Sequence, residues 1–361
     1  MQKHSLPCLT EEHTMKVLAI SDIYLKSEYY EECFGNRPEY ELQVIRFGSE
    51  DFNEMRETFH RIERNGPEAV EIPAEIYGAI EDADILMVHI CPVPAALIAR
   101  GKKLRAILTN RGGLENIAVA KATECGIPIL NNPAHNANGV AELAVGLMVT
   151  ETRNIARAHL GLVNGVWRED YLNKDNTWEL RKKTVGIIGF GNIGHRVAEL
   201  LHVFGCKILV YDIRYDPDDE MLASLPIKTV DLETLLRESD IVTLHVRGTE
   251  VVLDRTLLSM MQPHAFFINT ARAHLVDYDA LYELLRDRKI MGAAIEVHPE
   301  EPLPADYPFL TLDNVTLTSH RGGATINAYS DSPEMLLTDY ARYLSGKKPR
   351  FFVNPEVGYG K

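Results

Sequence analysis

The sequence predicts an α/β protein with two doubly wound parallel-sheet domains. Short runs rich in Val, Ile and Leu alternate with helix-like segments along most of the 361 residues, which is typical of parallel strands joined by helices. A glycine-rich turn near residue 190 begins a second series of such units. The chain is also longer than one domain usually is, and its 45% hydrophobic content is enough for two cores.

The first domain is expected over residues 15–137, after a disordered tail at residues 1–14 that lacks the apolar core of a signal peptide. Asp51 is expected to cap a helix that ends where Gly66 and Pro67 follow each other. Strands are expected at 17–20, 42–47, 84–90, 105–109 and 127–130, and helices up to 34 and at 52–65, 74–81, 93–100 and 117–125.

The stretch from 184 to 212 predicts a dinucleotide-binding βαβ unit. An apolar strand is followed by Gly189, Gly191 and Gly194 in a G-x-G-x-x-G pattern, and a helix begins at Asn192. The glycines allow a tight turn, a close approach of the backbone to a pyrophosphate and contact between helix and strand. A second strand ends at Asp212, whose carboxylate can bind a ribose diol and repel a 2′-phosphate. The alternative is a plain βαβ unit with an accidental glycine pattern.

The second domain is expected over residues 138–323. After residue 212, helices are expected at 232–237, 255–261 and 278–288, and strands at 240–246, 265–269, 292–297 and 315–318. A last helix at 324–344 follows the completed sheet, and the chain from 324 to 361 is expected to return to the first domain. Residues 346–361 are expected to be an extended tail.

A long helical stretch begins at Asn138 and is apolar on more than one face at its start. Such a helix is buried, and one that links two domains can also pack against a second subunit. We expect this contact, in a homodimer. The alternative is that the helix is buried between the two domains of a monomer.

Composition argues against several kinds of partner. The net charge of −14 and the absence of a long basic run disfavour nucleic acid and anionic membrane surfaces. No apolar run reaches the length of a membrane span. The five cysteines are odd in number and scattered, so neither a disulfide framework nor a metal site is indicated. A reducing cytoplasm is the expected location.

Three further stretches follow predicted strands, where open α/β sheets bind ligands. Arg272, in INTARAHLVDYDAL, offers a fork of donors that suits a carboxylate. His320, in LTSHRGGAT, can exchange a proton near neutral pH, and a carboxylate partner would orient it. The third stretch, AIEVHPEEPLP, supplies such carboxylates. Taken alone, each is more simply an ordinary surface or core residue.

The ordered set resembles the family of D-isomer-specific 2-hydroxyacid dehydrogenases. The resemblance runs from about residue 104 to residue 320. It includes NIAVAKATECGIPILNNPAHNANGVAELAVGL, GFGNIG followed by YD, SDIVTLHV, FFINTARAHLVDYDAL, the pair Glu301 and Pro302, and SHRGGAT. It implies a flavodoxin-like substrate domain, a Rossmann domain that binds NAD, and an active site in the cleft between them. The implied substrates are small 2-keto or D-2-hydroxy acids such as glyoxylate, hydroxypyruvate or a sugar-acid derivative.

The resemblance also implies roles for individual residues. Arg272 is expected to bind the substrate carboxylate and carbonyl, His320 to be the acid–base group, and Glu301 to pair with that histidine. In reduction, hydride from the nicotinamide reaches the keto carbon while His320 delivers a proton to its oxygen. Substrate contacts are further expected from Arg111, Gly112 and Gly113. Cofactor contacts are expected from Gly189, Gly191, Asn192, Ile193, Gly194, Asp212, His245, Val246, Arg247, Thr270, Ala271, Glu296, Gly322 and Gly323.

Several positions depart from the family pattern. Glu296 stands where an aspartate is usual, and Arg247, His274, Arg321 and Arg111 replace proline, glycine or small or apolar residues. Arg111 and Arg321 suggest a substrate with a second anionic group. The alternative is that these arginines face water or pair with acids such as Glu115 or Glu300.

Two classes of function fit the resemblance. The first is an NAD-dependent oxidoreductase. The second is an NAD-sensing binding protein on the same fold, of the C-terminal-binding corepressor type, which can keep the same catalytic residues. The sequence contains no added interaction segment beyond the core, which favours the enzyme.

Overall fold

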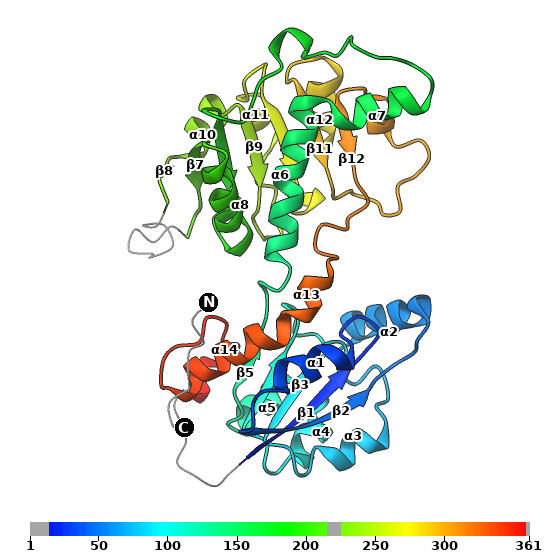
Figure 1. The fold of residues 1–361 in the computed structure, drawn as a ribbon, viewed down its shortest axis with the longest axis vertical. Helices are drawn as coiled ribbons and strands as arrows, with labels where there is room; N and C mark the ends of the chain where they lie inside the picture. Colours follow the sequence, from blue (N-terminus) through cyan, green and yellow to red (C-terminus); the bar gives the residue numbers. More distant parts are fainter. Residues whose placement is uncertain (1–13, 215–224, 359–361) are drawn as a thin grey trace. The chain divides into compact units, whose positions relative to one another are not determined.

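The structure is a computed structural model that describes residues 14–214 and 225–358. The chain divides into two compact units, Met1–Asn136 with Ile326–Lys361, and Ala137–Thr325 (Figure 1). The disordered tail predicted at residues 1–14 lies, apart from Thr14, outside the described residues. None of the helices in the described part of the chain combines the length and the hydrophobicity that a membrane crossing requires.

The first unit contains a parallel sheet of five strands in the order β2-β1-β3-β4-β5. This order is flavodoxin-like, and it reverses between β1 and β3. The strands are β1 (Met15–Ser21), β2 (Tyr40–Arg46), β3 (Ile85–Val88), β4 (Ala106–Thr109) and β5 (Ile129–Asn131). The helices are α1 (Ser27–Phe34), α2 (Phe52–Asn65), α3 (Ala74–Ala79), α4 (Ala95–Arg100), α5 (Val119–Glu124), α13 (Ile326–Ser330) and α14 (Ser332–Leu344), with the 3₁₀ turn η4 (Pro355–Val357).

Helices cover both faces of this sheet because its strands alternate apolar side chains between two cores. Side chains from α2 to α5 pack on one face, and side chains from α1 and α14 pack on the other. Asp51 caps α2, since its carboxylate accepts hydrogen bonds from the backbone N–H groups of Asn53 and Glu54. The helix ends at Gly66, which has a φ of 82°.

The C-terminal part of the chain differs in detail from the prediction. The single helix expected at 324–344 is two helices, because Pro333 lacks an N–H group and lies in the first turn of a new helix, α14. Within the segment predicted to be an extended tail, described residues are bound to the sheet of the first unit. Phe352 forms an antiparallel bridge with Leu130, and the Asn354 side chain accepts a hydrogen bond from the Ile129 N–H.

The second unit contains a parallel sheet of seven strands in the order β12-β11-β10-β9-β6-β7-β8, a Rossmann order with one added strand. The strands are β6 (Thr184–Ile188), β7 (Lys207–Tyr211), β8 (Ile227–Thr229), β9 (Ile241–Leu244), β10 (Phe266–Asn269), β11 (Gly292–Ile295) and β12 (Val315–Leu317). The helices are α6 (Ala137–Arg153), α7 (Ile155–Val163), α8 (Asn192–Val203), α10 (Leu232–Glu238), α11 (Arg255–Leu258) and α12 (Tyr278–Arg286), with the 3₁₀ turns η1 (Lys174–Asn176), η2 (Ala273–Leu275) and η3 (Pro308–Thr311).

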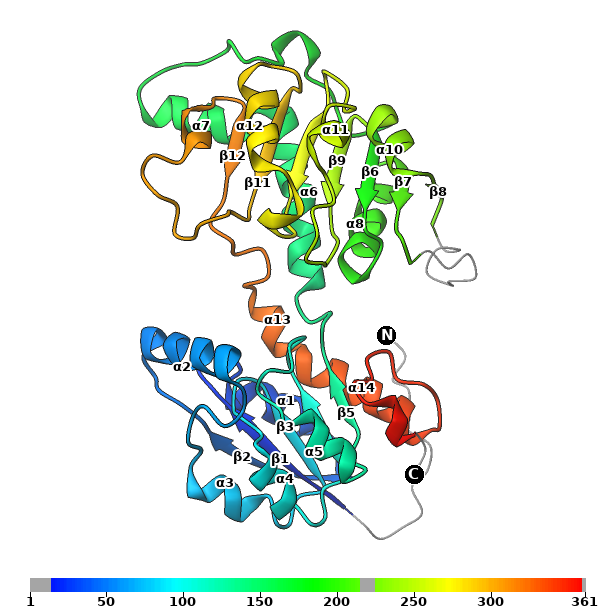
Figure 2. The ribbon, with the colours of Figure 1, turned by 180° about the vertical axis from the view of Figure 1, so that it is seen from behind.

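This sheet also has one core on each face. Helices α6 and α8 pack on one face and α10, α11 and α12 on the other, and Figure 2 shows the second set in front. Strand β8 was not predicted, because it has three residues at the sheet edge and none of them is buried. Both sheets are therefore parallel and covered on both faces, which confirms the predicted fold class.

The long helical stretch from Asn138 is not continuous. Asn154 has a φ of 56°, a left-handed conformation that ends α6 and separates it from α7. The Asn154 side chain donates a hydrogen bond to Asn173, which in turn donates to the backbone carbonyl of Thr152. These bonds stabilise a break that the periodicity of the sequence did not indicate.

Candidate functional site

The carboxyl ends of β10, β11 and β12 surround an open cavity of about 550 Å³ in the second unit. Arg272 follows β10, Glu301 lies in the loop after β11, and His320 follows β12. All three line the cavity, together with Tyr278 and His298. Parallel strands end at the same edge of a sheet, so residues far apart in the sequence meet here.

The ring of His320 and the carboxylate of Glu301 are joined by a hydrogen bond. The Nδ1 atom of His320 lies 2.8 Å from Oε2 and 3.1 Å from Oε1 of Glu301. The Glu301 Oε1 atom also accepts a hydrogen bond of 2.9 Å from the backbone N–H of His298. Partial burial raises the pKa of Glu301, but these hydrogen bonds and the nearby histidines outweigh that effect and lower it. Glu301 is therefore a carboxylate at neutral pH.

The backbone around His320 is held by Glu296. His320 has a φ of 52°, and its N–H donates to the carbonyl of Glu296. The Glu296 side chain is buried, and its Oε1 atom accepts a hydrogen bond of 2.7 Å from the N–H of Gly322. Glu296 was predicted to contact the cofactor. One of its carboxylate oxygens holds the loop that carries His320, and the contact with the cofactor stays a prediction.

His298 is a residue that the sequence analysis missed. Its backbone N–H binds Glu301, and its ring Nε2 lies 2.8 Å from the carbonyl oxygen of Thr318, two residues before His320. Since a carbonyl only accepts, Nε2 carries the proton. His298 therefore links the loop of Glu301 to the strand that leads to His320. The sequence signal that could have indicated His298 is its position in EVHPEEP, between the predicted site residues Glu296 and Glu301.

Arg272 extends from a turn that Asn269 stabilises. The Asn269 side chain accepts a hydrogen bond from the N–H of Ala271 and donates one to the carbonyl of Arg272. The guanidinium of Arg247 lies near that of Arg272. Burial and then the like charge of Arg272 lower the pKa of Arg247. The ring Nε2 of His274 lies 2.8 Å from the carbonyl of Gly248. The end of β10 thus gathers positive charge suited to an anion.

The predicted dinucleotide residues meet where the strand order reverses, between β6 and β9. Gly189 has a φ of 92°, and a Cβ atom there would lie 2.5 Å from Val246 and 2.8 Å from the backbone of His245. A Cβ atom on Gly194 would lie 2.1 Å from the Gly189 carbonyl oxygen. A Cβ atom on Gly191, in contrast, would meet nothing within 4 Å. The first and third glycines are therefore required by packing, and the second leaves open space beside the N-terminus of α8.

Two polar side chains beside this turn, Asp212 and His245, have a defined hydrogen-bonding pattern or protonation state. Asp212, after β7, accepts hydrogen bonds from the N–H groups of Phe190 and Arg214 at 2.6 and 2.7 Å. Each carboxylate oxygen has a further acceptor position for a ribose hydroxyl. Burial lowers the pKa of His245 to about 3, so this histidine is neutral at physiological pH. Other predicted cofactor residues lie at the ends of nearby elements. Asn192 and Ile193 begin α8, Thr270 and Ala271 follow β10, and Gly322 and Gly323 follow β12.

In the first unit, Arg111, Gly112 and Gly113 follow β4. Arg111 is buried and its Nη2 atom lies 3.1 Å from Glu115 and 3.2 Å from Glu63. This is the pairing with Glu115 that the sequence left open as the alternative to a substrate contact. Arg321 is exposed on the second unit.

A buried pair of Asp22 and His89 also lies in the first unit, at the point where its strand order reverses. The His89 Nδ1 atom is 2.9 Å from Asp22 Oδ2. Sequence analysis did not find this pair, because its members are 67 positions apart.

The chain is similar in sequence to enzymes that act on 2-hydroxy acids. A family model described as the NAD-binding domain of D-isomer-specific 2-hydroxyacid dehydrogenases matches residues 145–322. The chain is 41% identical to a hydroxypyruvate reductase from Thermotoga maritima over 70% of this chain and 82% of that protein. It is 35% identical to a glyoxylate reductase from Thermofilum pendens over 78% of this chain and 85% of that protein. The chain belongs to the family of D-isomer-specific 2-hydroxyacid dehydrogenases.

The solved structures agree with this assignment. A D-lactate dehydrogenase from Sporolactobacillus is similar with a TM-score of 0.70 and 25% identity, over 94% of this chain and 99% of that one. As a member of the family, the protein is an NAD-dependent enzyme. The matched residues 145–322 cover most of the second unit, including the turn whose second glycine leaves room for a pyrophosphate. The residues present therefore fit this cofactor.

Proposed function

We propose that this dehydrogenase interconverts a small 2-keto acid and the corresponding D-2-hydroxy acid, with His320 as the acid–base group. The observation that carries the proposal is the hydrogen bond between His320 and Glu301 in an open cavity that Arg272 also lines. A histidine oriented by a carboxylate, next to a guanidinium that can bind an anion, is the arrangement this reaction requires.

The residues of the chain divide the work as follows. Glu301 holds Nδ1 of His320, which leaves Nε2 to give a proton to the carbonyl oxygen in reduction and to take it back in oxidation. Arg272 binds the carboxylate and stabilises the negative charge that develops on the carbonyl oxygen. The N–H groups of Gly112 and Gly113 bind the same carboxylate, as the family resemblance implies. Bound NAD supplies or accepts the hydride.

The names of the relatives suggest which substrates to test first. They are reductases of hydroxypyruvate and glyoxylate. Purified protein should oxidise NADH in the presence of one of these keto acids, measured as loss of NADH absorbance across a series of 2-keto acids. If none of them is reduced while NADH still binds, the chain is better described as an NAD-sensing binding protein.

NAD is proposed to be favoured over NADP because of Asp212. Its carboxylate would repel a 2′-phosphate, whereas Arg214, two residues later, is the counter-evidence. One charged contact of about 1.4 kcal/mol corresponds to about tenfold in kcat/KM. NADH should therefore be used at least about tenfold better than NADPH, and equal values would contradict the role of Asp212.

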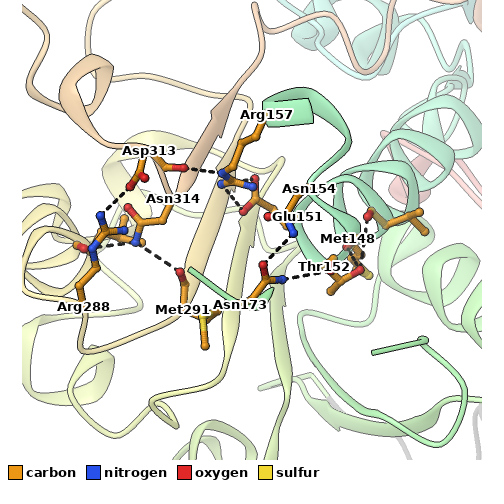
Figure 3. A network of polar contacts seen from close by, with 12 residues as sticks. Met148, Glu151, Thr152, Asn154, Arg157, Asn173, Arg288, Met291, Asp313 and Asn314 are labelled. Carbon is orange, nitrogen blue, oxygen red and sulfur yellow. Dashed lines mark hydrogen bonds and ion pairs between the residues drawn. The ribbon is translucent and has the colours of Figure 1, made fainter. Parts of the chain in front are cut away.

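A homodimer formed through α6 and α7 is also proposed. None of the residues of α7 is buried, and Leu160, Leu162 and Val163 are each more than half exposed. A buried network anchors the start of this helix, since Arg157 pairs with the buried Glu151 and donates to the carbonyl of Asp313 (Figure 3). An exposed apolar helix on such an anchor suits a subunit interface.

The oligomeric state tests this interface. Sedimentation equilibrium should give twice the chain mass for the wild type and a lower mass for Leu160→Glu. A monomeric wild type would refute the dimer.

We also propose a cytoplasmic location, because the cysteines in the described part of the chain are all free thiols.

A further inference from the structure

Arg111 is a buried cation directly before the loop that is proposed to bind the substrate carboxylate. Its relative exposure is 7%, and its guanidinium stacks 4.6 Å from the ring centre of Phe59. The Nη2 group binds Glu63 of α2 and Glu115, on the far side of the loop. The guanidinium thus connects α2, through Phe59 and Glu63, to the loop that contains Glu115. We call these four residues the Arg111 cluster.

The Arg111 cluster fixes the shape of the loop. The bond from Arg111 to Glu115 closes across Gly112 and Gly113, and a Cβ atom on Gly113 would lie 2.3 Å from the Glu115 carboxylate and 3.1 Å from the guanidinium. On the other side, the Asn131 side chain donates a hydrogen bond of 2.9 Å to the carbonyl of Gly112. A side chain at 113 would therefore displace the Glu115 carboxylate from Arg111, and the loop is held from both sides.

The charges around Arg111 do not favour a second anion from a substrate. Two carboxylates contact one guanidinium, so the three groups together carry a net negative charge. The Nη1 atom has no hydrogen-bond partner among the described residues, but it has almost no exposure to solvent. Nη1 is therefore enclosed and not open to a substrate anion, which both acids would repel.

We propose that Arg111 is a positioning residue for substrate binding and not a receptor for a second anionic group. It acts through Glu115 and Glu63, by holding the N–H groups of Gly112 and Gly113 in the orientation that receives the reacting carboxylate. This inference rests on the proposed function of that loop. It accounts for a large cation at a position where the family pattern has a small residue.

The test is the variant Arg111→Met, which keeps the apolar stem on Phe59 and removes the charge. A misplaced binding group can cost up to about 100-fold, so we expect kcat/KM for glyoxylate to fall by about 10- to 100-fold, mainly through KM. The loss for a doubly charged keto acid such as 2-oxoglutarate should agree within about threefold, and KM for NADH should not change. Arg111→Lys should recover part of the loss, because an ammonium can pair with one of the two acids.

A matched variant tests the partner. Glu115→Gln should raise the KM for glyoxylate in the same way, and adding it to Arg111→Met should cost little more, since both changes remove one interaction. A loss confined to 2-oxoglutarate, or a KM for glyoxylate that stays at the wild-type value in Arg111→Met, would overturn the inference.

Amide hydrogen exchange measures the loop without any substrate. A peptide spanning residues 110–116 should exchange faster in Arg111→Met than in the wild type, because the loop is no longer held. Unchanged exchange would overturn the inference. If the wild type reduces no keto acid at all, the proposed function fails while this measurement still decides the role of Arg111.

Discussion

Two of the histidine–carboxylate pairs among the described residues, one in each unit, make almost the same contact. His320 lies 2.8 Å from Glu301, and His89 lies 2.9 Å from Asp22. Their exposure differs strongly. The side chains of His320 and Glu301 are 40% and 37% exposed, whereas those of His89 and Asp22 are 9% and 1% exposed. The same chemistry is open to a ligand in one unit and enclosed in the other.

The hydrogen bonds of Asp22 indicate that the buried pair has a structural role. Asp22 accepts from the backbone N–H groups of Tyr24, Leu25 and Ile90 in addition to His89. It therefore ties the ends of β1 and β3 together. Burial raises the pKa of Asp22, but the charge and hydrogen bonds of His89 and the backbone lower it overall. We infer that the buried pair stabilises the fold and that the open pair exchanges protons.

The largest effect should separate the two histidines in activity. Replacing His320 by Ala removes general acid catalysis, which is worth about 10²- to 10⁴-fold in rate. The kcat for keto-acid reduction should fall by that factor, while NADH binding and the melting temperature stay close to the wild type. His89→Ala is the control and should act mainly on stability. Equal losses of kcat in two equally folded variants would contradict the division of roles.

The second effect should separate the two carboxylates in stability. Breaking a buried ion pair by removing one partner costs about 3–5 kcal/mol, so Asp22→Ala should lower the free energy of unfolding by that amount. Glu301→Ala should cost no more than about 1 kcal/mol, because its pair is exposed and screened. Denaturant unfolding of both variants gives the comparison. A larger loss for the Glu301 variant would reverse our interpretation.

The open pair could be predicted from the sequence, and the buried pair could not. Arg272, Glu301 and His320 each follow a predicted strand, and the family resemblance assigned their roles. The pairing of Asp22 with His89 depends on β1 lying next to β3, which requires the strand order and not only the strands. Arg111 shows the same limit, since its partner Glu63 is on a helix 48 positions earlier.

Features that depend on neighbouring residues were predicted well, and features that depend on distant contacts were missed. The boundaries of α2 were predicted correctly because an aspartate cap and a glycine stop are short-range features. The break at Asn154 was missed, since it depends on a hydrogen bond to Asn173, on a separate segment. The turn at Gly189 was predicted correctly because close backbone contacts require a glycine there.

A smaller effect concerns the pH dependence of the open pair. Glu301→Gln removes the negative charge beside the His320 ring, and a negative charge favours a protonated neighbour. The upper pH limit of keto-acid reduction should then move down. The lower pH limit of hydroxy-acid oxidation, which needs the neutral imidazole, should move in the same direction. Unchanged profiles of kcat/KM would mean that Glu301 is not the partner.

The smallest effect is the acid dependence of stability at the buried pair. The pKa of Asp22 is lower in the folded protein than its ordinary value of 3.8. As the pH falls, the unfolded chain takes up this proton first, so the stability that Asp22 contributes is complete above about pH 4 and is lost below it. The difference in melting temperature between the wild type and Asp22→Asn should therefore be constant from pH 7 to 5 and shrink below pH 4. Glu301→Gln is the control and should show a smaller change, since the lowered pKa of Glu301 belongs to an exposed group. If the difference for Asp22→Asn is the same at pH 3 as at pH 7, the buried carboxylate does not stabilise the fold through its charge.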